Sequence, residues 1–138
     1  MSSTPSQCVT RPVPPTLAPK SFEISQRFFF DAAHTLKREI EAEGSRRIHG
    51  HTYNAEITLG GIPDPTTGMV VDLGLVRQAI ETLRPRLDHH LLDEVEGLGV
   101  PTLENLCAYI WNAIAPALPS LVQVKVWRDG IGDSCSLR

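Results

Sequence analysis

The sequence predicts an α+β domain in which two helices cover one face of a four-stranded antiparallel sheet. Segments near both ends of the chain alternate polar with apolar residues, as half-buried strands do. Two central segments instead carry apolar residues at spacings of three and four, which is typical of amphipathic helices. The predicted order is therefore two strands, two helices and two strands, and a length of 138 residues fits one such domain.

The first two strands are expected before and after a charged connection. Phe22 to Phe30 is aromatic and partly alternating, so we expect a strand there, with His34 just past its end. Lys37 to Arg47 suits a mobile or partly helical connection that could fold over a site. Ile48 to Gly60 alternates along its whole length, which predicts a strand with both of its histidines on the face that apolar residues continue.

Two helices follow a cluster of glycines and prolines between residues 60 and 68. Leu73 to Leu83 is the first, with Asp72 as its N-cap and Pro85 beyond its end. Thr102 to Ala117 is the second, with Thr102 as N-cap. These caps satisfy backbone N–H groups that the first turn leaves unpaired.

The remaining segments complete the domain. Leu121 to Trp127 alternates valines with polar residues and predicts a strand, and Gly130 to Gly132 allows a turn into a last short strand. Residues 1–20 are rich in proline, serine and threonine, so we expect a flexible arm there and a single domain over residues 21–138.

Composition argues against several classes of function. A net charge of -3 with interspersed signs gives no basic stripe for nucleic acid, although a local arginine cluster could bind a small anion. Three widely spaced cysteines without a CxxC motif indicate neither a disulfide framework nor a thiolate zinc site, as expected in a reducing cytoplasm. There is no apolar stretch of the roughly 20 residues that a membrane span needs, and no secretory leader is visible. We therefore expect a soluble cytoplasmic protein with no membrane partner.

Three histidines form a candidate zinc site. His49 and His51 lie two apart on a predicted strand and so project from one face, where they can converge on one ion. His34 from a neighbouring strand would give three protein ligands and leave the fourth position open, as in catalytic zinc sites. A His-x-His pair alone is common in ordinary strands, so the prediction rests on the whole constellation, including the nearby motif that contains Asp88 and His89.

Five ordered motifs between Phe22 and Arg138 make the chain resemble the 6-pyruvoyl-tetrahydropterin synthase family, including its bacterial branch, the 6-carboxy-tetrahydropterin synthases. The motifs are Phe30-Asp31-Ala32-Ala33-His34, Ile48-His49-Gly50-His51-Thr52-Tyr53, Gly68-Met69-Val70-Val71-Asp72-Leu73, Leu87-Asp88-His89-His90-Leu91-Leu92-Asp93 and Pro101-Thr102-Leu103-Glu104-Asn105-Leu106.

The resemblance implies a T-fold subunit in a ring-stacked homo-oligomer, typically a hexamer, with active sites between subunits. It also implies zinc held by His34, His49 and His51, and a pterin substrate, 7,8-dihydroneopterin triphosphate. In that family zinc binds the hydroxyls of the substrate side chain and eases proton movement between carbons. Asp88 and His89 match the family's acid/base relay, in which the carboxylate orients the imidazole. His90 is expected to be structural.

The first departure from the family concerns the catalytic base. The family's catalytic cysteine stands four residues before the first histidine of His-Gly-His, and that position here is Ser45. A hydroxyl is a far weaker acid than a thiol, whose pKa is near 8.5, so Ser45 needs activation by His89 or zinc. Glu43 could supply a carboxylate base instead, and family members with a glutamate near this position cleave the side chain differently.

The second departure concerns recognition of the pterin. The family's Glu-Thr pair, which clamps the pterin's amino and ring N–H groups, is replaced by Arg128 and Asp129. Arginine is a donor only, so it suits a carboxylate, phosphate or carbonyl edge. Asp129 could take over the clamp with a shift of one residue, or Arg128 could form a salt bridge in a rearranged pocket. Arg128 with Thr102 and Glu104 is expected to form the substrate wall.

Two functional hypotheses follow from this pattern. The first is a zinc-dependent lyase of the 6-pyruvoyl/6-carboxy-tetrahydropterin synthase type, which acts by metal-assisted proton transfer. The alternative is a non-catalytic or specificity-changed paralogue that binds a pterin-like or anionic ligand, because the usual base and anchor are both replaced. The sequence leaves open whether the pathway is that of a queuosine precursor, biopterin or folate.

Overall fold

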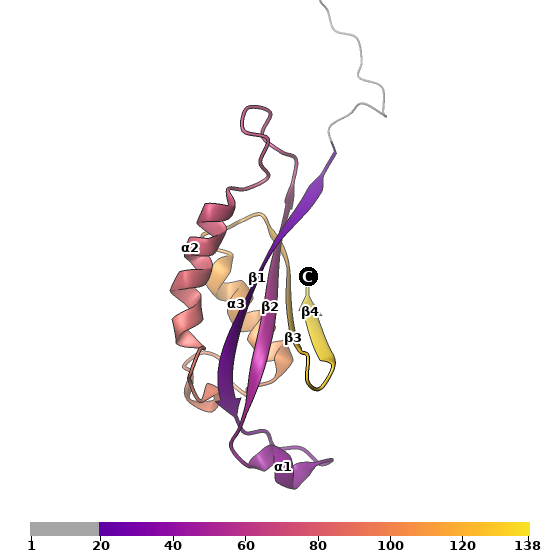
Figure 1. Ribbon diagram of the computed structural model, residues 1–138, viewed down its shortest axis with the longest axis vertical. Coiled ribbons are helices and arrows are strands. Elements are labelled where there is room, and N and C mark those ends of the chain that lie inside the picture. Colours follow the sequence, from indigo (N-terminus) through magenta and orange to yellow (C-terminus); the bar gives the residue numbers. More distant parts are fainter. Residues whose placement is uncertain (1–19) are drawn as a thin grey trace, which may run out of the picture.

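The predicted architecture is confirmed by a computed structural model, which describes residues 20–138. Four antiparallel strands form one sheet in the order β1-β2-β3-β4, and the two longer helices, α2 and α3, lie on the same side of it (Figure 1). The arm expected over residues 1–20 lies outside the described residues, apart from Lys20. The sequence order is ββααββ with one further short helix between the first two strands.

Strand β1 is longer than predicted. It runs over Phe22–His34 and pairs with β2 (His49–Gly61) along its whole length, from Phe22 opposite Gly61 to His34 opposite His49. The expectation that the strand stops at Phe30 was wrong, because two alanines after Asp31 weaken the local strand signal while pairing with β2 continues. His34 is therefore the last residue of the strand and its side chain is buried.

The C-terminal strands complete the sheet. β3 (Leu121–Arg128) pairs with β2, with one irregularity in the register between Thr58 and Leu59. β4 (Asp133–Leu137) pairs with β3 so that Arg128 lies opposite Asp133 across the hairpin turn.

Both predicted helix caps are present. α2 (Leu73–Leu83) begins after Asp72, whose carboxylate accepts a hydrogen bond from the Gly74 N–H at 2.8 Å. α3 (Leu103–Ile114) begins after Thr102, whose hydroxyl accepts from the Asn105 N–H at 3.1 Å. α3 ends three residues earlier than expected, since the chain tightens there into a turn in which the Ala117 N–H bonds to the Ile114 carbonyl.

The core lies between the sheet and the two helices. Phe30 and Tyr53 stack on the inner face of the sheet with ring centroids 5.2 Å apart. Apolar side chains of α2 and α3 cover this face, including the fully buried Ile110. None of the helices in the described part of the chain is both long and apolar enough to cross a membrane. Cys107 and Cys135 are both free thiols.

The charged connection after β1 contains a short helix. α1 (Ala42–Arg46) lies beyond the end of the sheet where β1 finishes and β2 begins (Figure 1). It is anchored at both sides of Ser45, whose N–H donates to the Glu41 carbonyl and whose carbonyl accepts from the Leu36 N–H at 2.7 Å. The partly helical connection expected from the sequence is thus present, and it lies next to the histidine end of the sheet.

The packing of α3 on the sheet can be tested by truncating one side chain. Ile110→Ala is expected to lower the free energy of unfolding by about 2–5 kcal/mol, because it removes buried methyl groups and leaves a cavity. Asn112→Ala, on the exposed side of the same helix, should change it by less than about 0.5 kcal/mol. Urea unfolding of the two variants measures both values. Equal losses would show that α3 does not pack on the sheet through Ile110.

Candidate metal centre and active site

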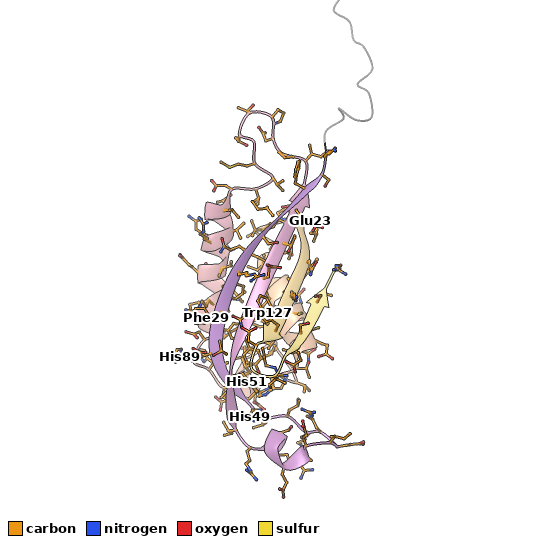
Figure 2. All side chains as sticks on the ribbon, turned by 45° about the vertical axis from the view of Figure 1, so that its right-hand side comes forward. Glu23, Phe29, His49, His51, His89 and Trp127 are labelled. Atoms are coloured by element: carbon orange, nitrogen blue, oxygen red, sulfur yellow. The ribbon has the colours of Figure 1, made fainter. Side chains whose placement is uncertain are left out.

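Three imidazoles converge at one end of the sheet. His34 comes from the end of β1, and His49 and His51 come from the start of β2. The Nε2 atoms of His49 and His51 lie 3.0 Å and 3.2 Å from Nε2 of His34. Figure 2 shows His49 and His51 at the end of the sheet next to α1, far from Glu23 at the other end. One potential ligand atom from each histidine lies within 4.8 Å of the others.

Backbone carbonyls fix the orientation of two of these rings. Nδ1 of His34 lies 3.0 Å from the Pro101 carbonyl oxygen, and Nδ1 of His49 lies 2.7 Å from that of Arg47. A carbonyl only accepts, so each Nδ1 carries the proton and each Nε2 of a neutral ring presents a lone pair. Two lone pairs that face each other at 3.0 Å repel unless a cation lies between them. In metal-binding histidines, the ring nitrogen that does not bind the metal typically donates to such a carbonyl.

The spacing and protonation of the rings fit zinc. Tetrahedral zinc with nitrogen ligands at about 2.0–2.1 Å places those nitrogens about 3.3 Å apart, close to the two distances from His34. Burial lowers the pKa of His51 to about 4, and the nearby Arg128 guanidinium adds to this shift. Burial also lowers the pKa of His34. These two rings are therefore neutral near pH 7, which is the form that binds a metal.

A cavity of about 770 Å³ opens over the three histidines. The connection after β1 lines one side of it with Glu43 and Ser45, and the β3–β4 hairpin lines the other with Arg128 and Asp133. The structure thus brings both candidate bases and the arginine to the same cavity as the histidines. A volume of this size is large enough for a bicyclic ligand.

The two candidate bases differ in their surroundings. Ser45 is buried, with 8% of its surface exposed, and its backbone is hydrogen-bonded on both sides. The side chain of Glu43 is 91% exposed, and its carboxylate lies 3.9 Å from the Arg47 guanidinium. Ser45 is therefore fixed in place, whereas Glu43 can reorient toward a bound ligand.

Arg128 is held by an aspartate that was not predicted as a site residue. Its Nε donates to Oδ1 of Asp133 at 3.0 Å and its Nη2 donates to Oδ2, which makes a bidentate pair. The remaining terminal nitrogen, Nη1, lies 3.3 Å from Nε2 of His51. The guanidinium also lies over the ring of Tyr53, at 5.9 Å from its centroid. The salt bridge that the sequence raised as one alternative for Arg128 is thus present, with Asp133 as its partner.

Asp88 and His89 are close to each other but lie outside this cavity. Oδ2 of Asp88 is 2.9 Å from Nδ1 of His89, and the side chain of His89 is 79% exposed. A second hollow, of about 550 Å³, is lined by His89 together with Asp31 and Thr52 from the opposite face of the sheet, and His51 borders both this hollow and the cavity. Within one chain the pair therefore lies at the same end of the sheet as the histidine cluster but not in the same cavity.

The segment that carries Asp88 and His89 is hydrogen-bonded along the edge of β1. The Asp31 N–H donates to Oδ1 of Asp88 at 2.9 Å, which lowers the pKa of that carboxyl, with the His89 bond adding to the effect. The His89 N–H donates to the Asp31 carbonyl, and the Thr35 N–H donates to Asp93 at 2.8 Å. These bonds hold His89 in a left-handed conformation with φ of 61°, which is rare outside glycine.

Three other candidate residues lie away from the cavity in the single chain. Thr102 caps α3, Glu104 is exposed in the first turn of that helix, and Asp129 accepts a hydrogen bond from the Asn54 amide at 3.2 Å. The Nε2–H group of His90 donates to the Pro85 carbonyl at 2.9 Å, which fits the structural role expected for this residue.

Asp133 and the backbone carbonyls of Pro101 and Arg47 were not predicted as parts of the site. The pairing of Asp133 with Arg128 could have been read from the hairpin, since the two residues flank its turn. The carbonyls carry no side-chain signal. Tyr53 was assigned only to a strand face, yet its hydroxyl is buried without a hydrogen-bond partner in the described residues, and burial raises its pKa to about 12.

Comparisons with known proteins agree on one family. Residues 23–138 match the family described as 6-pyruvoyl tetrahydropterin synthase. The human 6-pyruvoyl tetrahydrobiopterin synthase is 33% identical over 118 residues, which cover 75% of this chain and 81% of the human protein. The 6-pyruvoyl tetrahydrobiopterin synthase of Poecilia reticulata is 42% identical over 82 residues. This match covers 56% of this chain and 56% of the Poecilia protein, which is about half of each.

Relatives named for other reactions match equally well. The 6-carboxy-5,6,7,8-tetrahydropterin synthase of Synechocystis is 34% identical over 75% of this chain and 83% of its own. The dihydroneopterin monophosphate aldolase of Pyrococcus furiosus is 32% identical over 74% of this chain and 82% of its own. The solved structure of the Caenorhabditis elegans 6-pyruvoyl tetrahydropterin synthase superposes with a TM-score of 0.76 at 23% identity, over 87% of this chain and 96% of that one. This last likeness shows the fold.

The low pKa of His51 predicts how stability depends on pH without metal. Unfolded His51 takes up a proton near pH 6.5, whereas folded His51 stays neutral down to about 4, so stability should fall as the pH drops through this window. Urea unfolding in the presence of a chelator at pH 7 and pH 5 measures the loss. Between these two pH values the free energy of unfolding should fall less in His51→Gln than in wild type. In His90→Gln, which alters an exposed ring, it should fall as much as in wild type. If His51→Gln lost as much stability as wild type, His51 would not be the group that causes the pH dependence.

Proposed function

The chain belongs to the 6-pyruvoyl tetrahydropterin synthase family, and on that premise we propose that it is a zinc-dependent lyase. Its substrate would be 7,8-dihydroneopterin triphosphate or a related pterin, and its reaction would proceed by metal-assisted proton transfer. The observation that carries the proposal is the convergence of three imidazole nitrogens at the floor of an open cavity. Zinc bound there would polarise an oxygen of the substrate side chain and so acidify the neighbouring C–H group.

Glu43 is the residue we assign as the base. Its carboxylate borders the cavity and, unlike a hydroxyl, is a group that commonly serves as a general base. Ser45 borders the same cavity, but a hydroxyl needs a neighbouring base to become an anion. In the described residues its hydrogen bonds run through the backbone. Ser45 would then shape the wall on which the substrate side chain rests.

Asp88 and His89 would act as the acid/base relay for a neighbouring subunit. His89 is exposed, and its hydrogen bond to Asp88 orients the ring so that the other ring nitrogen is free to exchange a proton. Its separation from the cavity of its own chain supports a site shared between subunits of a ring-shaped homo-oligomer. A hexamer would contain six such shared sites.

Two related functions have specific support. Similarity to the Pyrococcus aldolase, together with a glutamate at the cavity, favours cleavage of a carbon–carbon bond in the pterin side chain as one alternative. The pairing of Arg128 with Asp133 favours the other, a paralogue of changed specificity that binds a pterin-like or anionic ligand. Thr102 and Glu104 would contact substrate only if a neighbouring subunit brings it to them, and Asp129 could still serve as a pterin acceptor.

The assignment of the base is tested by matched substitutions. Zinc-loaded enzyme is incubated with 7,8-dihydroneopterin triphosphate, and chromatography follows triphosphate release and the pterin products. Glu43→Gln is expected to lower kcat by at least about 100-fold, since it removes the proton acceptor. Ser45→Ala should keep kcat within about tenfold of wild type, because it removes only a neutral contact.

The opposite pattern, with Ser45→Ala inactive and Glu43→Gln active, would show that Ser45 is the acting residue. Ser45→Cys adds a further comparison, because a thiol at this position should increase release of triphosphate if the rest of the site binds the substrate as the synthases do. Turnover by none of these proteins, with measurable pterin binding, would favour the non-catalytic alternative.

The shared site is tested by mixing two inactive variants. Glu43→Gln and His89→Ala oligomers are dissociated, combined in equal amounts and reassembled. If each site takes Glu43 from one chain and His89 from its neighbour, about a quarter of the sites regain both residues and activity returns to that level. Absence of recovery in reassembled oligomers of correct size would show that both residues act within one chain.

A further inference from the structure

Arg128 is positioned between an aspartate and a candidate metal ligand. Only 15% of its side chain is exposed, and two of its three nitrogens are bound to Asp133. The third, Nη1, lies 3.3 Å from Nε2 of His51, the nitrogen that also faces His34. The hairpin register supports this geometry, because Arg128 and Asp133 lie opposite each other on β3 and β4.

One lone pair on His51 therefore has two possible partners. It can accept a hydrogen bond from Nη1 or bind a metal, but it cannot do both. With a metal bound, the guanidinium and the metal ion are neighbouring cations on one wall of the cavity. Asp133 balances the charge of Arg128, whereas an imidazole that binds a metal through its lone pair contributes no negative charge, so a divalent metal on the three histidines would remain unbalanced.

The other residues that line the cavity place no carboxylate next to the histidines that could balance the charge of a bound metal. Glu43 is 91% exposed, and Glu41 is paired with Arg38 at 3.0 Å, so these carboxylates lie near the mouth of the cavity. A metal bound to the histidines would make the floor of the cavity positive, whereas at the mouth Glu41 is paired with Arg38 and Glu43 lies near Arg47. An elongated ligand with one anionic end would be oriented by this field, with its anionic end toward the histidines.

We propose that Arg128 is the specificity-determining residue of this site and that it selects a ligand whose side chain ends in an oxyanion, a carboxylate or a phosphate, next to the three histidines. The proposal rests on the metal centre of the proposed function. Nη1 donates to one oxygen of the anion, and Asp133 holds the guanidinium so that this donor stays directed into the cavity. A neutral side chain of the same length leaves Nη1 of Arg128 and the charge of the metal without an anionic partner and binds less well.

The first experiment compares two fluorescent pterins that differ in one group. Zinc-loaded protein is titrated with pterin-6-carboxylate and with 6-hydroxymethylpterin, and quenching gives each Kd. Wild type should favour the carboxylate by about tenfold or more, as expected for a hydrogen bond to a charged group. Arg128→Gln should bring the two Kd values within about twofold of each other. Arg27→Gln removes a salt-bridged arginine on the outer face of β1 and should keep the wild-type preference.

Competition with inorganic phosphate distinguishes the two sources of the anion. Displacement of pterin-6-carboxylate at phosphate concentrations that leave 6-hydroxymethylpterin bound would identify a phosphate-bearing side chain, and failure to displace it would identify a carboxylate. Equal affinity of zinc-loaded wild type for both pterins would overturn the proposal while leaving the lyase assignment intact.

The second experiment needs no organic ligand. Zinc affinity is measured by competition with a chelator in anion-poor buffer, with thermal melting as a check of folding. Arg128→Gln removes a cation beside the metal and should bind zinc at least about tenfold more tightly than wild type, and Asp133→Asn should bind it more weakly. The double variant, which lacks both charges, should return to within a few-fold of wild type. Identical zinc affinities in all four proteins would overturn the proposal, whereas zinc binding by none of them would instead remove the metal centre on which the proposed function rests.

Discussion

The full-length pairing of β1 with β2 is the constraint on which the candidate site depends. It places His34 opposite His49, and the two-residue period of β2 places His51 on the same face. A shift of the register by one residue would turn either strand's side chains to the other face and separate the imidazoles. The same face continues inward as Tyr53, Ala55 and Ile57, so burial of the core and alignment of the histidines are fixed by one alternation. The packing that stabilises the sheet thus also holds the three histidines in place.

The two faces of the sheet carry different parts of the candidate chemistry. The histidine cluster, Glu43 and Arg128 line the cavity at the end of the inner face, whereas His89 lies in a hollow that Asp31 and Thr52 of the outer face share with His51. Hydrogen bonds from Asp31 and Thr35 tie the His89 segment to the same strand end that carries His34. One strand therefore carries His34 on one side and supports the segment of Asp88 and His89 on the other. This arrangement gives a physical reason for a site completed by a second subunit, as we propose.

Local signals predicted most of the fold and the centre of the site. The N-caps Asp72 and Thr102 could be predicted from the sequence, because capping depends on one side chain and the backbone next to it. The face of β2 that carries the histidines could also be predicted, because the apolar residues that follow at every second position mark that face as the buried one. The extension of β1 to His34 was missed because pairing with another strand overrides the weak propensity of its alanines. The location of His89 and the hold of Asp133 on Arg128 depend on contacts between segments, which local patterns do not contain.

The central claim is that His34, His49 and His51 hold one zinc ion with an open position toward the cavity. Anomalous diffraction at the zinc absorption edge, on crystals of protein purified without chelators, tests it most directly. The account predicts one peak per chain within about 2.1 Å of the three Nε2 atoms, with a water or a ligand as the fourth neighbour. A chain with no peak at this position after zinc has been supplied, or with an ion bound elsewhere, would contradict it.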